Sequence, residues 1–186
     1  MRWTLPLITI AAVAVPALAS ESIPVPTFRE VQIRGGGMVD IVPGPMQRVT
    51  LVEGSTQFTR FHVDSNGQLK IDTCADRCPQ IYRMRVEVQS PSVPDVAVNG
   101  GGIITVGRGF SPQRHLEAAI SGGGKIDTSD VDAATVGAAI NGGGDILIRA
   151  RDALSAAVNG GGLIRFRGHP QVSSAVRGGG LVREAD

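Results

Sequence analysis

Two cysteines have a spacing that could support chemistry. Cys74 and Cys78 are separated by three residues, in the stretch Cys-Ala-Asp-Arg-Cys-Pro. Redox motifs place two residues between their cysteines, and a zinc site would need two further ligands, yet no histidine lies close in the sequence. In an exported protein this spacing favours a structural disulfide that pins a local turn, with redox catalysis and metal binding as the alternatives.

Carboxylates and histidines are the next candidates, because glycan-cleaving enzymes built on parallel β-helices need two or three carboxylates on one face. Asp127 and Asp145 fall in adjacent repeats but in offset columns, and His62, His115 and His169 are scattered. No nucleophile elbow or metal motif accompanies them. The sequence therefore predicts a non-enzymatic protein without cofactor or metal, and a polysaccharide-active enzyme is the weaker alternative.

Glycine triplets are the third candidate, since glycine-rich loops can bind anions. Gly-Gly-Gly occurs six times, and the last five triplets are spaced 22, 20, 18 and 18 residues apart. A phosphate loop occurs once, between a strand and a helix, and calcium repeats need a nine-residue period with a recurrent Asp. The triplets therefore indicate corners, where glycine reverses the chain and lets stacked backbones approach. The predicted structural corners are Gly35, Gly36, Gly37, Gly100, Gly101, Gly102, Gly122, Gly123, Gly124, Gly142, Gly143, Gly144, Gly160, Gly161, Gly162, Gly178, Gly179 and Gly180.

Apolar residues recur at fixed distances from each triplet. β-Branched residues stand two positions before the first glycine and two positions after the last, and further apolar columns lie six before and four after. A period of two on both sides of the corner indicates strands. Stacked units would align these columns and bury a continuous core. We therefore predict an all-β parallel β-helix, or β-solenoid, with Gly-Gly-Gly corners and coils of about 18–22 residues.

Two outward columns accompany the apolar ones. Alanine stands three positions before the triplet in five repeats, where the strand pattern points the side chain outward. This stripe consists of Ala97, Ala119, Ala139, Ala157 and Ala175. A flat, uncharged sheet face favours association, so the stripe is a candidate subunit interface, and coverage by another segment of the chain is the alternative. Directly before the glycines, Asn99, Ser121, Asn141 and Asn159 predict a hydrogen-bonded ladder along the stack.

Residues 28–95 repeat less visibly, and we expect them to form irregular strands that join and cap the stack. The segments 28–34, 38–42, 47–52, 59–63, 68–72 and 82–89 alternate or are rich in β-formers. Asn66-Gly67 is the strongest hairpin marker of the chain. Pro91 and Pro94 separate this half from the regular coils at 96–183, and the charged residues 183–186 are expected to end the stack.

The first 19 residues have the pattern of a secretory signal peptide. Arg2 precedes an apolar run of 13 residues from Leu5 to Ala17, and Ala17-Leu18-Ala19 is a small-x-small cleavage site. The run is shorter than the roughly 20 residues of a membrane span. Removal of the signal peptide would remove one basic residue, Arg2, and leave 17 basic and 17 acidic residues. This charge balance argues against nucleic acid or an anionic membrane as partner. We expect one exported domain, residues 20–186, in the periplasm, in the extracellular space or at the cell surface of a bacterium, without a transmembrane segment.

These features together resemble a known bacterial family. Val31 and Ile33 in the first strand, Leu69-Lys70-Ile71 and Val86-Glu87-Val88 precede the reiterated Val-Asn-Gly-Gly-Gly-x-Ile units. The pattern is similar to the family described as putative auto-transporter adhesins with a head GIN domain, and it covers about residues 28–183. The usual family unit is Ser-Gly-Ser-Gly, so glycine at the middle position is a conservative departure. The resemblance implies an exported β-solenoid without catalytic residues.

The resemblance also sets the expected partners. We expect a module that contacts a cell-envelope or extracellular polymer or protein, as an adhesin would. The alternative is a structural envelope protein that self-associates as a homo-oligomer. No cofactor is implied.

Overall fold

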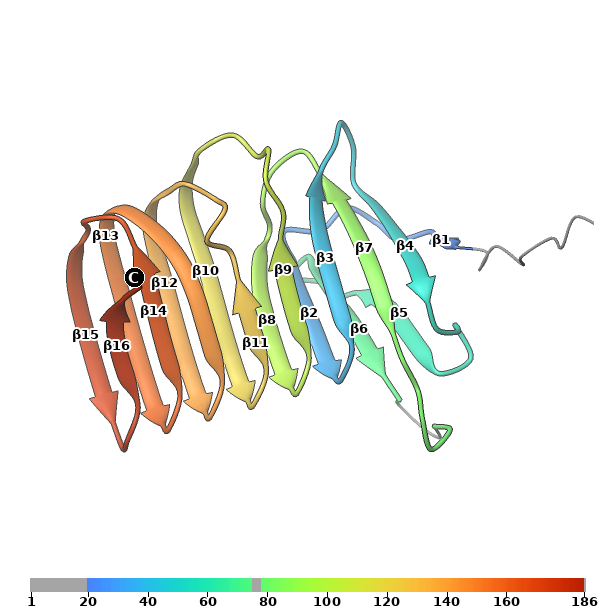
Figure 1. The fold of residues 1–186 in the computed structure, drawn as a ribbon. Coiled ribbons are helices and arrows are strands. Elements are labelled where there is room, and N and C mark those ends of the chain that lie inside the picture. Colours follow the sequence, from blue (N-terminus) through green and yellow to red (C-terminus); the bar gives the residue numbers. More distant parts are fainter. Residues whose placement is uncertain (1–19, 75–77, 186) are drawn as a thin grey trace, which may run out of the picture.

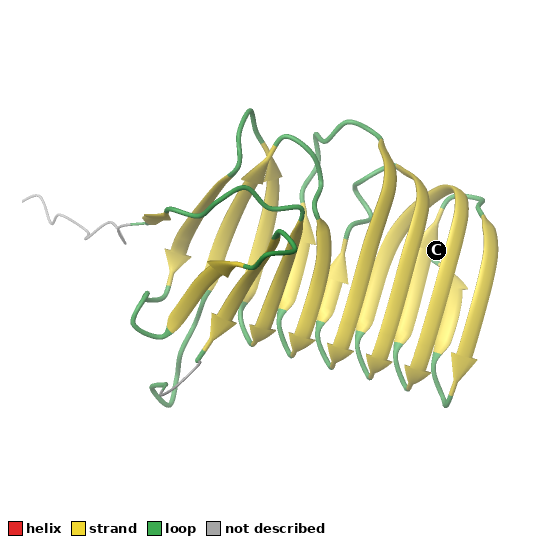
Figure 2. Ribbon diagram, turned by 180° about the vertical axis from the view of Figure 1, so that it is seen from behind, coloured by secondary structure: helices red, strands yellow, loops and turns green. Residues whose placement is uncertain are grey.

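The computed structural model describes residues 20–74 and 78–185, so the predicted signal peptide, residues 1–19, lies outside the described part. These residues form sixteen strands, and no helix occurs among them. The strands belong to one mostly parallel sheet that curves until it nearly closes around an axis (Figures 1 and 2). The all-β prediction is thereby confirmed.

The two opposing halves of this sheet are called sheet A and sheet B here. In spatial order, sheet A contains β1 (Glu21–Ile23), β4 (Arg48–Glu53), β7 (Arg85–Ser90), β3 (Met38–Pro43), β9 (Ile103–Val106), β11 (Lys125–Asp127), the first part of β13 (Asp145–Gly160), β14 (Leu163–Arg167) and β16 (Leu181–Glu184). Sheet B contains β5 (Thr59–Val63), β6 (Gln68–Thr73), β2 (Glu30–Gly35), β8 (Asp95–Gly100), β10 (Gln113–Gly122), β12 (Ala133–Gly142), the second part of β13 and β15 (Gln171–Arg177). Each triplet joins a strand of sheet B to a strand of sheet A.

The triplets stack in register, as the aligned columns predict. Gly100 is the parallel partner of Gly35 on one side and of Gly122 on the other, and Gly142 pairs with Gly122 and Gly160. The first triplet thus lies beside the second although 65 residues separate them in the sequence. The intervening segment forms β4 to β7, which extend the stack toward its N-terminal end.

The core lies between the two sheets and follows the predicted columns. Residues two positions before the triplets are at most 3% exposed in five of the six repeats. These residues are Ile33, Val98, Ile120, Ile140 and Val158. Residues two positions after the triplets are at most 1% exposed in the same five repeats, which shows that β-branched side chains from both sheets meet in one layer. The regular repeats therefore bury the apolar side chains that no single repeat could cover.

The three glycines of a corner have different environments. The first has a positive φ in all six triplets, between 95° and 134°. A Cβ on the first or third glycine would come within 3 Å of neighbouring atoms in every triplet, as at Gly142 and Gly144. A Cβ on the middle glycine, as at Gly143, would meet nothing within 4 Å, and no middle glycine has a positive φ. Conformation and space thus require glycine at the first position and space requires it at the third, whereas neither does at the second.

The N-terminal end of the stack is finished by antiparallel strands. β5 pairs antiparallel with β6, and β1 pairs antiparallel with β4. The turn between β5 and β6 contains Asn66 and Gly67, as predicted, and the Asp64 carboxylate accepts hydrogen bonds from the backbone N–H groups of Asn66 and Gln68 at 2.9 and 3.1 Å. Lys70 Nζ lies 2.8 Å from the same carboxylate. These hydrogen bonds lower the pKa of Asp64 to about 2, with the Lys70 bond as the largest cause.

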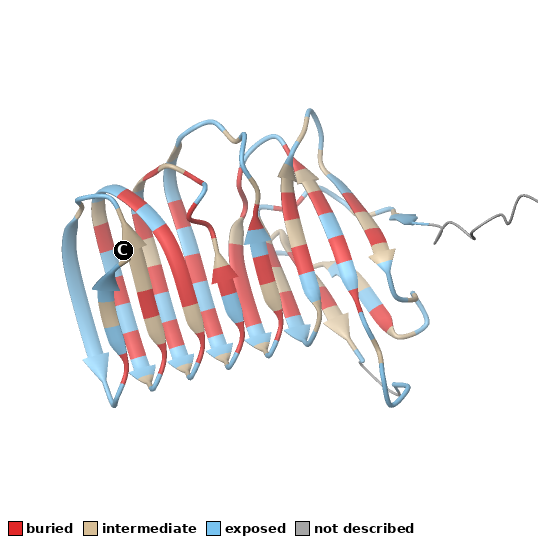
Figure 3. Cartoon of the chain, viewed as in Figure 1, coloured by how far each residue is buried: buried red, intermediate tan, exposed pale blue. Residues whose placement is uncertain are grey.

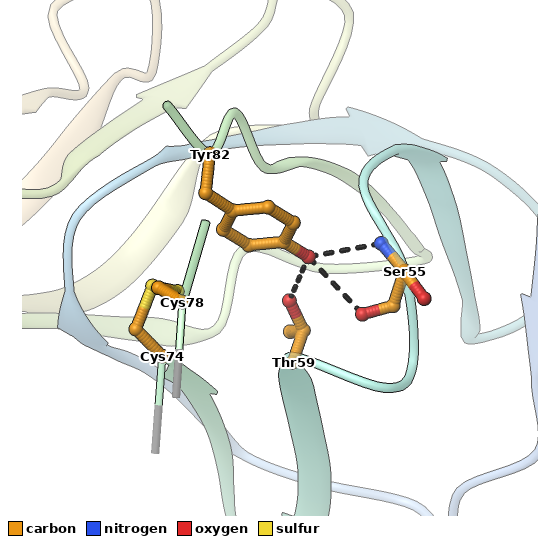
Figure 4. The surroundings of a disulfide bond; sticks show 5 residues. All are labelled: Ser55, Thr59, Cys74, Cys78 and Tyr82. Carbon is orange, nitrogen blue, oxygen red and sulfur yellow. Dashed lines mark hydrogen bonds between the residues drawn. A yellow bond between two sulfur atoms is a disulfide. The ribbon is translucent and has the colours of Figure 1, made fainter. Parts of the chain in front are cut away.

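A disulfide joins Cys74 to Cys78 near this end, with a Cα separation of 5.4 Å. Beside it, the Tyr82 hydroxyl lies 2.7 Å from Thr59 Oγ1, accepts a hydrogen bond from Ser55 N at 2.9 Å and donates to Ser55 O at 3.1 Å (Figure 4). These bonds tie the turn between β4 and β5, which contains Ser55 and ends at Thr59, to the segment before β7, which contains Tyr82. The predicted disulfide is present and its role here is local.

The C-terminal end has no such covering strands. β15 pairs with β13 and β16 with β14, and all seven residues of β15 are exposed (Figure 3). Val172 and Val176 are 45% and 43% exposed although they continue the buried columns. The charged segment expected to end the stack contributes β16, which leaves the apolar end of the core open to solvent.

Candidate functional site

A trough runs across the outer face of sheet B. Its floor is the alanine column together with the backbone between alanines, and its volume is about 530 Å³. One rim is the polar column directly before the triplets, with Asn99, Ser121, Asn141 and Asn159. Gln32 and Arg177 lie at its two ends. We call this feature the alanine trough.

The direction and length of the alanine trough follow from the register of the strands. The lining residues come from β2, β8, β10, β12, β13 and β15, which are successive neighbours in sheet B. Neighbouring strands lie about 4.8 Å apart, so six strands give a trough about 24 Å long that runs along the axis of the stack. A ligand in it would lie across the strands and not beside a strand edge.

Two details differ from the sequence expectation. Ala119, Ala139, Ala157 and Ala175 are exposed as predicted, but Ala97 is buried, with 8% exposure. Ala97 has Gln32 of β2 as its neighbour on one side and Ala119 of β10 on the other. Gln32 has a longer side chain than the alanines that flank the other members of the column. The face was also expected to be flat, yet it is hollowed, because small alanines alternate with longer side chains one position before the triplets.

The predicted ladder of polar side chains is present in part. Asn159 Nδ2 donates a hydrogen bond to Asn141 Oδ1 at 3.4 Å, a long separation for such a bond. All four side chains of the rim are exposed. Their amide and hydroxyl groups therefore face solvent beside the trough and can donate to and accept from a ligand.

A second hollow of about 300 Å³ adjoins the trough on the same face and shares Ala139 and Ala157 with it. Here His115 Nδ1 lies 2.9 Å from Thr135 Oγ1, and His115 Nε2 lies 2.8 Å from Glu117 Oε1. The sequence analysis did not identify this cluster, because His115 and Thr135 are 20 residues apart and become neighbours through the register of β10 and β12.

The Thr135–His115–Glu117 cluster has the residue types of a hydrolytic triad but lies open to solvent. The Thr135 hydroxyl lies 3.1 Å from the carbonyl oxygen of Arg114 and 2.9 Å from His115 Nδ1, so the carbonyl competes with the imidazole for its one proton. Both His115 and Glu117 are about half exposed, which leaves the cluster in contact with water. We interpret it as an ordered polar border of the binding face.

The outer face of sheet A has a different character. Arg85 Nε donates to Asp40 Oδ2 at 2.7 Å, and Arg165 donates to Asp145 Oδ2 at 2.7 Å. The hydrogen bond from Arg85 to Asp40 raises the pKa of the arginine. Charged side chains on this face thus neutralise one another in pairs.

The two carboxylates considered for catalysis lie on this ion-paired face. Asp127 Oδ1 accepts hydrogen bonds from Ser129 N at 3.1 Å and Ser129 Oγ at 2.8 Å, whereas Asp145 pairs with Arg165. Asp127 is the register partner of Leu147 and not of Asp145. The structure therefore gives each carboxylate its own hydrogen-bond partner and places the two on a diagonal of neighbouring strands, not directly opposite each other. Within residues 20–74 and 78–185, no three metal-ligating side chains gather at one point.

A family comparison bears directly on these repeats. Residues 111–170 match the model of the family described as "Putative auto-transporter adhesin, head GIN domain". The match spans β10 to β14, so it contains the central part of the alanine trough with Ala119, Ala139 and Ala157. The resemblance inferred from the sequence is confirmed for this segment.

Solved structures support the fold. A putative adhesin from Bacteroides fragilis NCTC 9343 superposes with a TM-score of 0.59 at 16% identity, covering 92% of this chain and 98% of its own. A putative adhesin from Parabacteroides merdae ATCC 43184 gives 0.40 at 16% identity, covering 92% and 97%. A putative cell adhesion protein from Clostridium sporogenes ATCC 15579 gives 0.43 at 9% identity, covering 89% and 98%. At these identities the first match shows a shared fold, and the other two scores are too low to carry an argument.

No curated protein matches the chain significantly. In the described part of the chain, no helix has the length and apolar character needed to cross a membrane.

Proposed function

We propose that this protein is an exported, non-enzymatic binding module of the adhesin type, a single β-solenoid that holds an elongated, uncharged ligand in the alanine trough. The observation that carries the proposal is the trough itself, a hollow of about 530 Å³ on the outer face of sheet B. The head GIN match over residues 111–170 supports the adhesin class. Export rests on the signal-peptide pattern of residues 1–19.

The shape of the trough selects an elongated ligand. It crosses six strands, and its length of about 24 Å along the axis exceeds the span of a single sugar or amino acid. A linear polysaccharide advances by about one strand spacing for each sugar ring, so successive rings would meet successive Asn or Ser side chains. An envelope or extracellular polymer of this kind fits the site better than a compact metabolite.

The charge of the trough selects a neutral ligand. Arg177 at the C-terminal end is the one ionisable residue among those that line it. Desolvating a carboxylate or sulfate group on an alanine floor would cost free energy that no cation in the centre of the trough offsets. Hydroxyl groups, in contrast, can exchange hydrogen bonds with the Asn99, Asn141 and Asn159 amides while the apolar ring faces contact alanine.

The test is a binding screen of the secreted protein against immobilised linear polysaccharides, with neutral, acidic and basic members. The probe variant is Ala139→Glu, which places a charge on the trough floor. The matched control is Thr105→Glu, which adds the same charge at an exposed, outward position of sheet A. We expect a neutral polymer to bind, with at least about tenfold weaker binding to Ala139→Glu, a change of about 1.4 kcal/mol.

Two outcomes would contradict the proposal. Equal loss of binding in both variants would place the ligand elsewhere or show a general charge effect. Cleavage of a bound polymer, detected by product analysis, would make the protein an enzyme and redirect attention to the charged side chains around the trough.

A further inference from the structure

The C-terminal end of the stack offers a pairing surface that the preceding repeat does not. Val172 and Val176 are 45% and 43% exposed, whereas Leu154 and Val158, in the same columns one repeat earlier, are 1% and 2% exposed. Beside these side chains, β15 and β16 each have one neighbouring strand, so their outer edges carry backbone N–H and C=O groups that another strand could bind.

The opposite end of the stack is closed, which bears on what could cover the open end. The core residues next to that end, Val49, Leu51, Leu69 and Ile71, are at most 3% exposed because the antiparallel strands β1 and β5 lie over them. A head-to-tail contact would have to join the apolar open end to this covered one, and repeated contacts of that kind grow into filaments. Contact between two open ends gives a closed two-fold dimer that does not grow further, and it buries the apolar end of one copy against the apolar end of the other.

The sequence of β15 makes such a contact self-complementary. The strand reads Gln-Val-Ser-Ser-Ala-Val-Arg, and its core-facing positions are Val172, Ser174 and Val176. This core-facing set is the same in both directions about Ser174. In an antiparallel pair centred on Ser174, Val172 of each copy lies opposite Val176 of the other, and Gln171 lies opposite Arg177, so no like charges oppose each other.

Other registers are worse. A shift of one residue would set the core-facing valines against outward positions. A shift of two residues would place valine opposite Ser174 at one end and leave the other valine opposite Pro170 or Gly178. The centred register is the one that matches both valines.

We propose that two copies of this chain associate through their C-terminal ends, with the two β15 strands paired antiparallel about Ser174. The two-fold axis continues sheet B from one copy into the other and covers Val172 and Val176 of both. The inference does not rest on the proposed function, although β15 also contributes Ala175 and Arg177 to the end of the alanine trough. The interface is small and partly polar, since serine at 174 replaces the alanine of the earlier repeats, so the expected dimer is weak.

The register gives a specific test by disulfide trapping. In the proposed dimer the two copies of residue 174 lie directly opposite, with Cα atoms about 4.5–5.5 Å apart, inside the range that a disulfide accepts. The two copies of residue 173 are a strand diagonal apart, at about 7–8 Å or more, outside that range. Ser174→Cys and Ser173→Cys are both substitutions at exposed positions, so both variants are expected to fold.

The secreted full chain of each variant would be oxidised at several concentrations, separated without reductant, and its disulfides mapped by mass spectrometry. We expect Ser174→Cys to form at least about tenfold more covalent dimer than Ser173→Cys, because only its geometry fits a disulfide. Adding Val176→Lys should abolish the trapping, since a charge would replace a core-facing valine, whereas adding Ala139→Glu should leave it unchanged.

The inference would be overturned by any of three results. They are equal trapping at 173 and 174, trapping that survives Val176→Lys, or no trapping together with a sedimentation coefficient of the unmodified protein that is independent of concentration. Trapping reduced by Ala139→Glu would instead place the self-contact on the alanine trough, and it would likewise overturn the proposed end-to-end dimer.

Discussion

The two outer faces of the stack are built on one repeated backbone but differ in what they expose. Sheet A carries ion pairs, such as Asp40 with Arg85 and Asp145 with Arg165. The centre of sheet B carries alanine in one outward column and Asn or Ser in the next. The strand spacing and the corners are shared, so the difference lies in the outward side chains alone. A repeat fold can therefore keep one face solvated and leave the other free for a ligand.

The faces also differ in what a ligand would have to displace. On sheet A a ligand would compete with charged side chains that already have partners at 2.7 Å. On sheet B it would meet exposed alanines and a rim whose one hydrogen bond between side chains, Asn159 to Asn141, is 3.4 Å long. The lower cost of desolvating alanine favours binding on sheet B.

Both faces depend on the corners, so the largest effect is expected there. Replacing Gly142 by Ala should destabilise the fold by about 2–4 kcal/mol, because the residue has a φ of 134° and its new Cβ would lie 2.4 Å from Gly122 O. The matched substitution Gly143→Ala meets no atom within 4 Å and should change stability by less than about 0.5 kcal/mol. Urea unfolding of both variants measures this, and equal destabilisation would contradict the assignment of roles within the triplet.

A smaller effect is expected from the rim of the alanine trough. Asn141→Ala removes one amide from the centre of the rim and should weaken binding of a neutral polymer about twofold to tenfold, the value of one hydrogen bond. Lys125→Ala, an exposed position of sheet A, should leave binding unchanged. Isothermal titration of both variants with the same polymer decides this, and a larger loss in Lys125→Ala would mean that the ligand contacts sheet A.

The smallest effect concerns the charged N-terminal margin of sheet B, where Lys70 pairs with Asp64. The Asp64 pKa is about 2 in the folded chain, below its ordinary value of 3.8. The carboxylate therefore stabilises the fold above pH 3.8, and this contribution is lost as the pH falls through about 2.

The contribution of the Asp64 charge to stability can be tested with Asp64→Asn, which keeps the size of the side chain. The variant should have a slightly lower urea midpoint than the wild type at neutral pH, and the difference should shrink as the pH falls below 3.8. A difference that stays constant down to pH 2 would show that the carboxylate charge is not what stabilises the turn. Binding to the trough should not change in either case.

Much of the fold was predictable because it repeats. The columns around the triplets predict which residues face the core, and β5 occupies residues 59–63 as predicted, with the Asn66-Gly67 turn after it. The alternation of Arg85, Glu87 and Gln89 with buried Val86 and Val88 is likewise present in β7. Local pattern and tertiary structure agree here because each column repeats the same environment.

The remaining features needed three-dimensional register. The Thr135–His115–Glu117 cluster depends on the parallel pairing of β10 with β12. An alignment of the repeats would have found it only by noting that His115 and Thr135 both stand seven positions before their triplets. The hollow shape of the alanine face depends on side-chain lengths in neighbouring columns. The open C-terminal end could not be seen either, because charged residues there suggested a cap.

The most direct test of the central claim is to ask where a bound polymer lies. Ala157→Cys places a thiol on the trough floor, and Thr105→Cys places one on the outer face of sheet A; each is labelled with a maleimide in the absence and presence of a saturating neutral polysaccharide identified in the screen. We expect the polymer to slow labelling at position 157 several-fold and to leave labelling at position 105 unaffected. Equal labelling rates at 157 with and without polymer, or protection at 105, would contradict it.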